Sequence, residues 1–117
     1  RKIDQPRRGQ EAAGEVAARI VWSELALESL GQFAAFIAKD SPHFAALTVS
    51  RILNCIEQAA AFPLSGRVVP EYAEPQLREL FWRNYRVIYR VETEQIIVLA
   101  IYHGHRLLPE DFDKESR

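Results

Sequence analysis

The spacing of apolar residues in this chain of 117 residues changes from a helical to a strand period close to the segment FPLSG at residues 62–66. Before this segment, apolar residues recur every three or four positions, which predicts two amphipathic helices. Ser23 and Ser41 are typical N-cap residues, and Pro42 suits the first position of the second helix. Because the connection KDSP is short, we expect an antiparallel helical hairpin that ends near Ala61.

After Gly66 the apolar residues alternate with polar ones, as in β-strands. The strands expected there are a short piece in GRVVPE at 66–71, LRELFW at 77–82, YRVIYRVE at 85–92 and IIVLAIYHG at 96–104. A further short strand, RIVW at 19–22, is expected before the first helix. Pro70 ends the short piece, and Asn84 suits a turn. The last run is apolar on both faces, which predicts an interior position in the sheet.

This order of elements predicts an α+β fold, in which a helical hairpin packs on one face of an antiparallel sheet. The length fits one domain, and the domain proper is expected to begin at Arg19. Residues 1–18 contain Pro6 and Gly9 without a steady apolar period, so we treat them as an N-terminal extension of unknown role. Residues 110–117 read as a solvated acidic tail.

Composition excludes several classes of protein. No apolar run approaches the roughly 20 residues of a membrane span, and the chain does not start with a signal-peptide pattern. The single cysteine, Cys55, rules out an internal disulfide, so we expect a cytoplasmic protein without a membrane partner. The net charge of −1 gives no bulk positive field, so a polyanion would need a local patch. Without Cys pairs, ligand-spaced His pairs, a phosphate loop or a nucleophile elbow, we expect no metal and no cofactor.

Arginines interrupt the predicted strand at 85–92. By alternation, Tyr85 and Val87 face the helices, whereas Arg86 and Arg90 point to the other, open face. Further candidates for this face or its edge are Arg67, Arg78, His103 and Arg106. Arginines flanked by a glutamate and a histidine can bind phosphates and hold a general acid–base pair.

A purely structural interpretation is equally open. An exposed sheet face must be polar, and an arginine opposite a glutamate is an ordinary cross-strand pair. Glu79, Glu92 and Glu94 supply such partners. His103 would then be a structural residue at the end of an apolar strand, and Glu71 a solvated carboxylate in a loop.

Several segments together resemble a known family. VWSELALESL, SPHFA, FPLSGRVVPE, LRELFWRNYRVIYRV and IYHGHRLLP follow one another in the order found in the RelE/ParE superfamily of bacterial toxins. The resemblance covers about residues 19–109. It implies a type II toxin–antitoxin fold, with a short N-terminal strand, a helical hairpin and a curved antiparallel sheet.

The superfamily implies two activities. ParE-like members poison DNA gyrase, whereas RelE-like members cut messenger RNA in the ribosome without a metal. In the nuclease reading, Arg86 matches the phosphate-stabilising arginine, with Glu71 as general base and His103 as general acid. Arg67 and Arg78 match arginines common in the superfamily. The aromatic residue that follows the histidine in the YoeB-like nucleases is replaced here by Gly104, which favours the ParE-like branch.

We therefore expect a toxin that inhibits gyrase or replication. The alternatives are a ribosome-dependent endoribonuclease and a degenerate member that only binds its antitoxin. The resemblance also implies an antitoxin that lays an amphipathic helix over the toxin's helices. The candidates for that surface are Phe33, Phe36, Phe44 and Trp82, although at least half of them are expected to complete the core.

Overall fold

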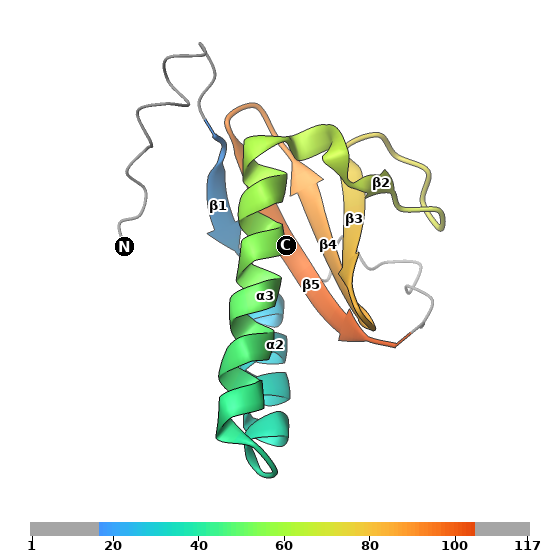
Figure 1. Ribbon diagram of the computed structural model, residues 1–117. Coiled ribbons are helices and arrows are strands. Elements are labelled where there is room, and N and C mark those ends of the chain that lie inside the picture. The colour runs from blue at the N-terminus through green and yellow to red at the C-terminus, as the bar shows by residue number, and fades with distance from the viewer. Residues whose placement is uncertain (1–16, 105–117) are drawn as a thin grey trace.

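The computed structural model describes residues 17–104, which form two layers, a helical hairpin and a sheet (Figure 1). The hairpin consists of α2 (Glu24–Ala38) and α3 (Pro42–Ala61), followed by a 3-10 turn, η1 (Pro63–Ser65). The strands are β1 (Arg19–Trp22), β2 (Arg67–Val68), β3 (Leu77–Trp82), β4 (Tyr85–Val91) and β5 (Gln95–His103). The α+β class and the helical hairpin are thus as the sequence predicts.

Both helices are capped by the predicted serines. The backbone N–H of Ala26 donates to Ser23 Oγ, and that of Phe44 donates to Ser41 Oγ, each at 3.0 Å. These bonds satisfy N–H groups that a helix cannot pair internally. Ser23 also donates its hydroxyl to the carbonyl of Leu99 on β5 at 2.8 Å, which fixes the start of α2 on the sheet.

The sheet is mixed, whereas the sequence predicts a wholly antiparallel sheet. Its strand order is β1-β5-β4-β3-β2, and β1 pairs with β5 in parallel. The other pairs are antiparallel because turns or a short loop join those strands directly. The helical hairpin and three strands separate β1 from β5 in the sequence, so no tight turn dictates their relative direction. β5 has neighbours on both sides, which confirms its predicted interior position.

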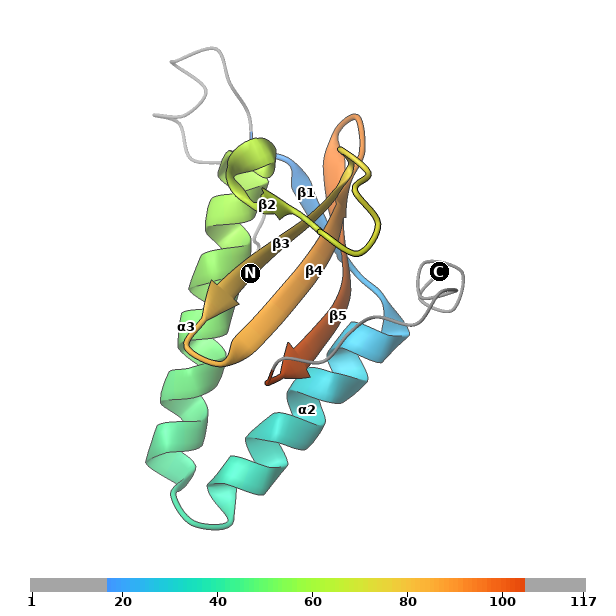
Figure 2. The same ribbon diagram turned by 90° about the vertical axis from the view of Figure 1, so that its right-hand side faces the viewer.

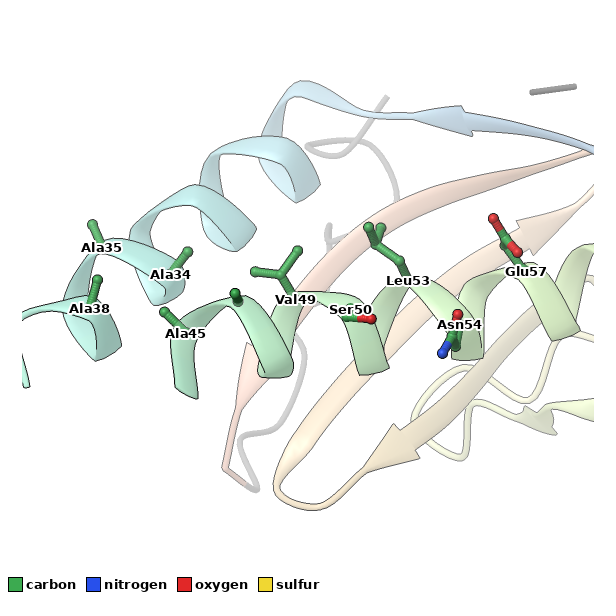
Figure 3. A pocket seen from close by; sticks show the side chains of 10 residues that line it. Ala34, Ala35, Ala38, Ala45, Val49, Ser50, Leu53, Asn54 and Glu57 are labelled. Atoms are coloured by element: carbon green, nitrogen blue, oxygen red, sulfur yellow. The ribbon is translucent and has the colours of Figure 1, made fainter. Parts of the chain in front are cut away.

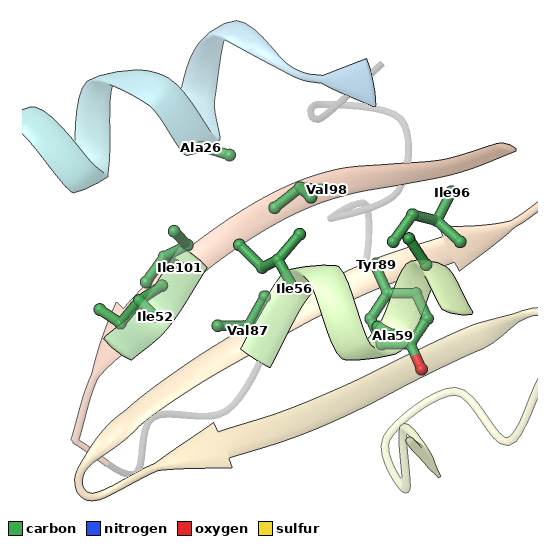
Figure 4. Close-up of a cluster of buried hydrophobic side chains, with 10 residues drawn as sticks. Ala26, Ile52, Ile56, Ala59, Val87, Tyr89, Ile96, Val98 and Ile101 are labelled. Atoms are coloured by element: carbon green, nitrogen blue, oxygen red, sulfur yellow. The ribbon is translucent and has the colours of Figure 1, made fainter. Parts of the chain in front are cut away.

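The main core lies between the hairpin and the sheet (Figure 4). Its buried members are Ala26, Ile52, Ile56, Ala59, Ala60, Val87, Tyr89, Ile96, Val98 and Ile101. Each large apolar side chain buried here stabilises the fold by about 1.5–3 kcal/mol. Val87 and Tyr89 lie on the helix-covered face, as the alternation along β4 predicts.

The opposite face of the sheet is also covered, contrary to the expectation of an open face. Val69, Leu77, Ile88, Leu99 and Ala100 form a second buried cluster there. The segment between β2 and β3 crosses this face and brings Val69 and Tyr72 onto it (Figure 2). The register of β4 and β5 shifts between Ile88 and Tyr89, which leaves Leu99 without a partner on β4. Through this bulge two consecutive residues of β5, Leu99 and Ala100, join the second cluster.

Candidate functional site

A chain of ionised side chains runs across the second face of the sheet. Arg86 on β4 donates from Nε to Oε1 of Glu79 on β3 at 2.6 Å. Arg86 also donates from Nη1 and Nη2 to both carboxylate oxygens of Glu71, at 3.1 and 2.8 Å. The second oxygen of Glu79 accepts from Nε of Arg67 at 2.7 Å. The charges therefore alternate along the order Arg67, Glu79, Arg86 and Glu71, and they cancel.

The two central residues of this network are buried, so each depends on the other to balance its charge. Arg86 is only 5% exposed and Glu79 only 1%. Burial lowers the pKa of Arg86, but its hydrogen bonds and charge interactions with Glu71 and Glu79 together outweigh this and raise it. Arg86 is thus held as a cation by two carboxylates. The side chain of Arg67, by contrast, is 65% exposed.

The prediction that Arg86 lies on an open face is wrong. The segment that carries Glu71 covers this part of the face, so the guanidinium meets carboxylates and not solvent. Arg90 is mostly covered as well, with Glu74 at 3.8 Å. Glu71 is a partner of Arg86 and not the solvated loop carboxylate of the structural interpretation.

His103 lies away from this network. It pairs with Tyr85 across β4 and β5, and the two rings lie 4.8 Å apart. Phe33 of α2 lies 6.3 Å from His103. His103 therefore faces the helices, whereas Arg86, the neighbour of Tyr85 along β4, faces the other way. The sheet thus brings Arg86 and Glu71 together and separates His103 from both.

Arg78 supports the backbone around η1. It donates from Nε to the carbonyl of Pro75 at 2.7 Å, and from Nη1 to the carbonyls of Leu64 and Gly66 at 3.2 and 3.0 Å. These contacts are those of a residue that holds two loops together. Arg106, the remaining predicted binding residue, lies outside the described residues.

Tyr89 fixes the same turn from the core side, a role that sequence analysis did not assign. Its hydroxyl donates to the carbonyl of Pro63 at 2.8 Å and accepts from the N–H of Gly66 at 3.1 Å. Burial raises the pKa of Tyr89, against smaller lowering contributions from Gly66, Arg78 and Ser65. The signal in the sequence for this role was a tyrosine at a core-facing position of β4, where a purely apolar side chain would be expected.

An apolar groove of about 710 Å³ runs between α2 and α3 (Figure 3). Its lining residues are Ala34, Ala35, Ala38, Ala45, Ala46, Val49, Ser50, Leu53, Asn54 and Glu57. The small side chains on α2 and at the start of α3 leave room between the helices, and Leu53 is exposed in the groove. A concave apolar strip along a helix pair can receive another helix.

The four aromatic residues predicted to face an antitoxin divide into two pairs. Phe33 and Trp82 pack against the main core. Phe36 and Phe44 are exposed, at 70% and 42%, on α2 and α3 respectively. This division agrees with the expectation that at least half of the four complete the core.

Two kinds of feature are absent from residues 17–104. Within this range no group of three or more His, Cys, Asp or Glu residues is placed to hold a metal ion. The helices of this range also lack the combination of length and hydrophobicity that a membrane span requires.

The two-layer fold is also found in a solved structure. A solved structure titled as a chromosomal ParDE TA system from P. aeruginosa superimposes with a TM-score of 0.63 at 18% identity. The match covers 76% of this chain and 98% of that chain, and it establishes the fold.

The sequence identifies the family. Residues 20–108 match the family described as ParE toxin of type II toxin-antitoxin system, parDE. A protein of Sinorhizobium fredii named "Putative toxin Y4kP" is 34% identical over 94 residues, which span 79% of this chain and 94% of the relative. The chain belongs to the ParE toxin family of type II toxin–antitoxin systems, and its family implies an antitoxin partner.

Proposed function

We propose that this toxin arrests growth by inhibiting DNA gyrase and does not cut RNA. The observation that carries the proposal is the placement of Arg86. A nuclease of the kind considered above needs a phosphate-binding arginine, a base and an acid around one phosphodiester. Here the donors of Arg86 are taken by Glu71 and Glu79, and His103 lies on the other face of the sheet.

Electrostatics support the same proposal. A phosphate would have to displace Glu71 from a bidentate contact and would then meet the buried carboxylate of Glu79. The chain carries a net charge of −1, so no general positive field draws RNA to it. Membership of the ParE family adds the gyrase target as the family-level expectation.

The test is a pulse-labelling experiment in a bacterial host after induction of this chain without its antitoxin. Thymidine and amino-acid incorporation are followed over the first minutes. The proposal expects DNA synthesis to stop first while translation continues. Translation that stops first would overturn it in favour of a ribosome-dependent nuclease, and unchanged growth would favour a chain that only binds its antitoxin.

We further propose that the antitoxin places an amphipathic helix in the groove between α2 and α3. The groove is lined by apolar residues from both helices, and the exposed Phe36 and Phe44 lie on the same hairpin. Leu53→Asp should weaken antitoxin binding about tenfold or more, because it buries a carboxylate in an apolar contact. Leu64→Asp is the matched control, since Leu64 is also exposed but lies on η1, outside the groove. Equal affinities for the two variants would contradict this placement.

A further inference from the structure

The turn between β3 and β4 combines an exposed arginine with a strained backbone. Trp82 pairs with Tyr85, so Arg83 and Asn84 form a two-residue turn, and both are exposed. Arg83 has a φ of 54°, in the left-handed region. Hairpin turns prefer Gly, Asn or Asp where φ is positive, because other side chains meet the backbone there. A strained arginine at an exposed turn raises the question of what its side chain does.

The side chain of Arg83 is placed on a row of aromatic rings. Its Cζ lies 5.1 Å from the centroid of the Trp82 ring, a cation–π distance. Trp82 stacks on Tyr85 at 6.2 Å, and Tyr85 in turn contacts Phe33 and His103 at 5.3 and 4.8 Å. The row therefore links the exposed guanidinium to the main core, which limits its freedom.

The turn is also tied to the end of β5. The N–H of Gly104 donates to the carbonyl of Asn84 at 2.8 Å. Exposed His103 precedes Gly104, so an imidazole lies beside the same turn. A partner that binds here would meet a surface that is already ordered, which reduces the entropic cost of binding.

Arg83 differs from the other arginines of the sheet in its bonding. Arg67 and Arg86 bind carboxylates, and Arg78 binds backbone carbonyls. Within residues 17–104, no carboxylate pairs with Arg83. Among these residues its N–H groups therefore have no carboxylate to bind and can bind one of a partner.

We propose that this turn is the surface by which the toxin binds its protein target, with the guanidinium of Arg83 on carboxylates of that target. Tryptophan and arginine are enriched among the residues that dominate the binding energy of protein interfaces. The planar guanidinium binds a carboxylate at two points. An acidic protein surface is favoured over nucleic acid, because the chain has a net charge of −1 and its other sheet arginines are occupied. This inference rests on the proposed function, since it requires that the target be a protein.

The turn and the groove between α2 and α3 are different surfaces. Figure 1 shows the β3–β4 turn at one end of the sheet, beside the helical hairpin. In Figure 3 the side chains of Leu53 and Glu57 point away from that turn. A substitution at the turn can therefore change contact with the target without altering the groove.

The decisive variant is Arg83→Gly. It removes the guanidinium and also relieves the left-handed strain, so its Tm should be at or close to the wild-type value. Each variant is induced over a range of levels in a bacterial host, and the toxin concentration that halves the growth rate is measured by immunoblot. For Arg83→Gly this concentration should rise roughly 30-fold, as for the loss of an interface hot spot. Arg83→Glu should raise it further, because a carboxylate repels an acidic target.

Two controls separate the guanidinium from backbone and charge effects. Ala73→Gly relaxes the other non-glycine residue with positive φ in residues 17–104, where φ is 55°, and should leave toxicity unchanged. Arg51→Gln removes an exposed charge from α3 and should also leave it unchanged.

Wild-type potency in Arg83→Gly would overturn the inference, and so would a wild-type chain that does not slow growth, because no target contact would then exist. If translation stops first while Arg83→Gly loses potency, the gyrase proposal fails but the turn remains the target surface. Binding of wild-type protein to duplex DNA that Arg83→Gly loses would overturn the choice of a protein partner.

Discussion

Glu71 and Arg86 are joined by two hydrogen bonds, in which both oxygens of the carboxylate accept from the guanidinium at 2.8 and 3.1 Å. Through this contact the segment between β2 and β3 is held on the second face of the sheet. The same contact occupies the arginine that resembles a phosphate-binding residue of the nucleases. One contact therefore both holds this segment on the sheet and occupies the guanidinium of Arg86.

The two glutamates of the network should differ in their contribution to stability. Glu79→Gln leaves Arg86 and Arg67 without their shared carboxylate in a buried site, so we expect a loss of about 3 kcal/mol in the free energy of unfolding. Glu71→Gln should cost less, about 1 kcal/mol, because the Glu71 side chain is 17% exposed and water can compensate. Urea denaturation measures both. Equal losses would show that the network does not depend on burial in this way.

Gly66 should not tolerate a methyl group. A Cβ at this position would lie 2.7 Å from the backbone oxygen of Glu79 and would also collide with the hydroxyl of Tyr89. Gly66→Ala should therefore lower the free energy of unfolding by about 2 kcal/mol through overpacking. Gly31→Ala is the matched control, because open space surrounds Gly31 inside α2, and it should stabilise by about 0.5–1 kcal/mol. A tolerated Gly66→Ala would mean that the turn held by Tyr89 can shift.

The stability of the fold should decrease at alkaline pH through Tyr89. Burial raises the pKa of Tyr89 in the folded protein above its ordinary value of about 10. Between the pKa of Tyr89 in the unfolded chain and its higher pKa in the folded protein, the hydroxyl loses its proton only in the unfolded state. The unfolded state then binds fewer protons, so the free energy of unfolding falls as pH rises. Below a pH of about 10, Tyr89 makes its full contribution to the stability of the fold. Tyr89→Phe should flatten this slope, at the cost of the bonds to Pro63 and Gly66, in denaturation curves measured from pH 8 to 11.

Thr48 offers a stabilising substitution. It is 2% exposed on α3, and among the described residues its hydroxyl has no hydrogen-bond partner. Replacing a buried unpaired hydroxyl by a methyl group of similar size removes a desolvation cost, so Thr48→Val should raise the free energy of unfolding by about 1 kcal/mol. Thermal unfolding would show this as a higher Tm. A lower Tm would indicate a partner for the hydroxyl, such as a water molecule.

The β1 strand and the bulge in β5 show what residue patterns leave undecided. RIVW predicts a strand, but nothing in its sequence says that it pairs with β5 in parallel. The sequence does not predict the bulge at Leu99 either, because Leu99 lies in an unbroken apolar run. The bulge is seen only in the pairing of β5 with β4. Both features depend on contacts between residues far apart in the chain.

The sequence alone determined the local elements, because their causes are local. Serine caps, the helical period, the change to alternation after Gly66 and the apolar run of β5 each act over a few residues, and all four are observed. The order of the segments was also sufficient to suggest the toxin superfamily. Only the tertiary structure decided which polar residues meet. The segment that carries Glu71 has no regular period, so alternation could not reveal that it covers the second face. The tertiary structure buries Arg86, which the strand pattern placed on an open face, between two carboxylates. Within residues 17–104 it leaves Arg83, to which the pattern gave no role, without a carboxylate partner.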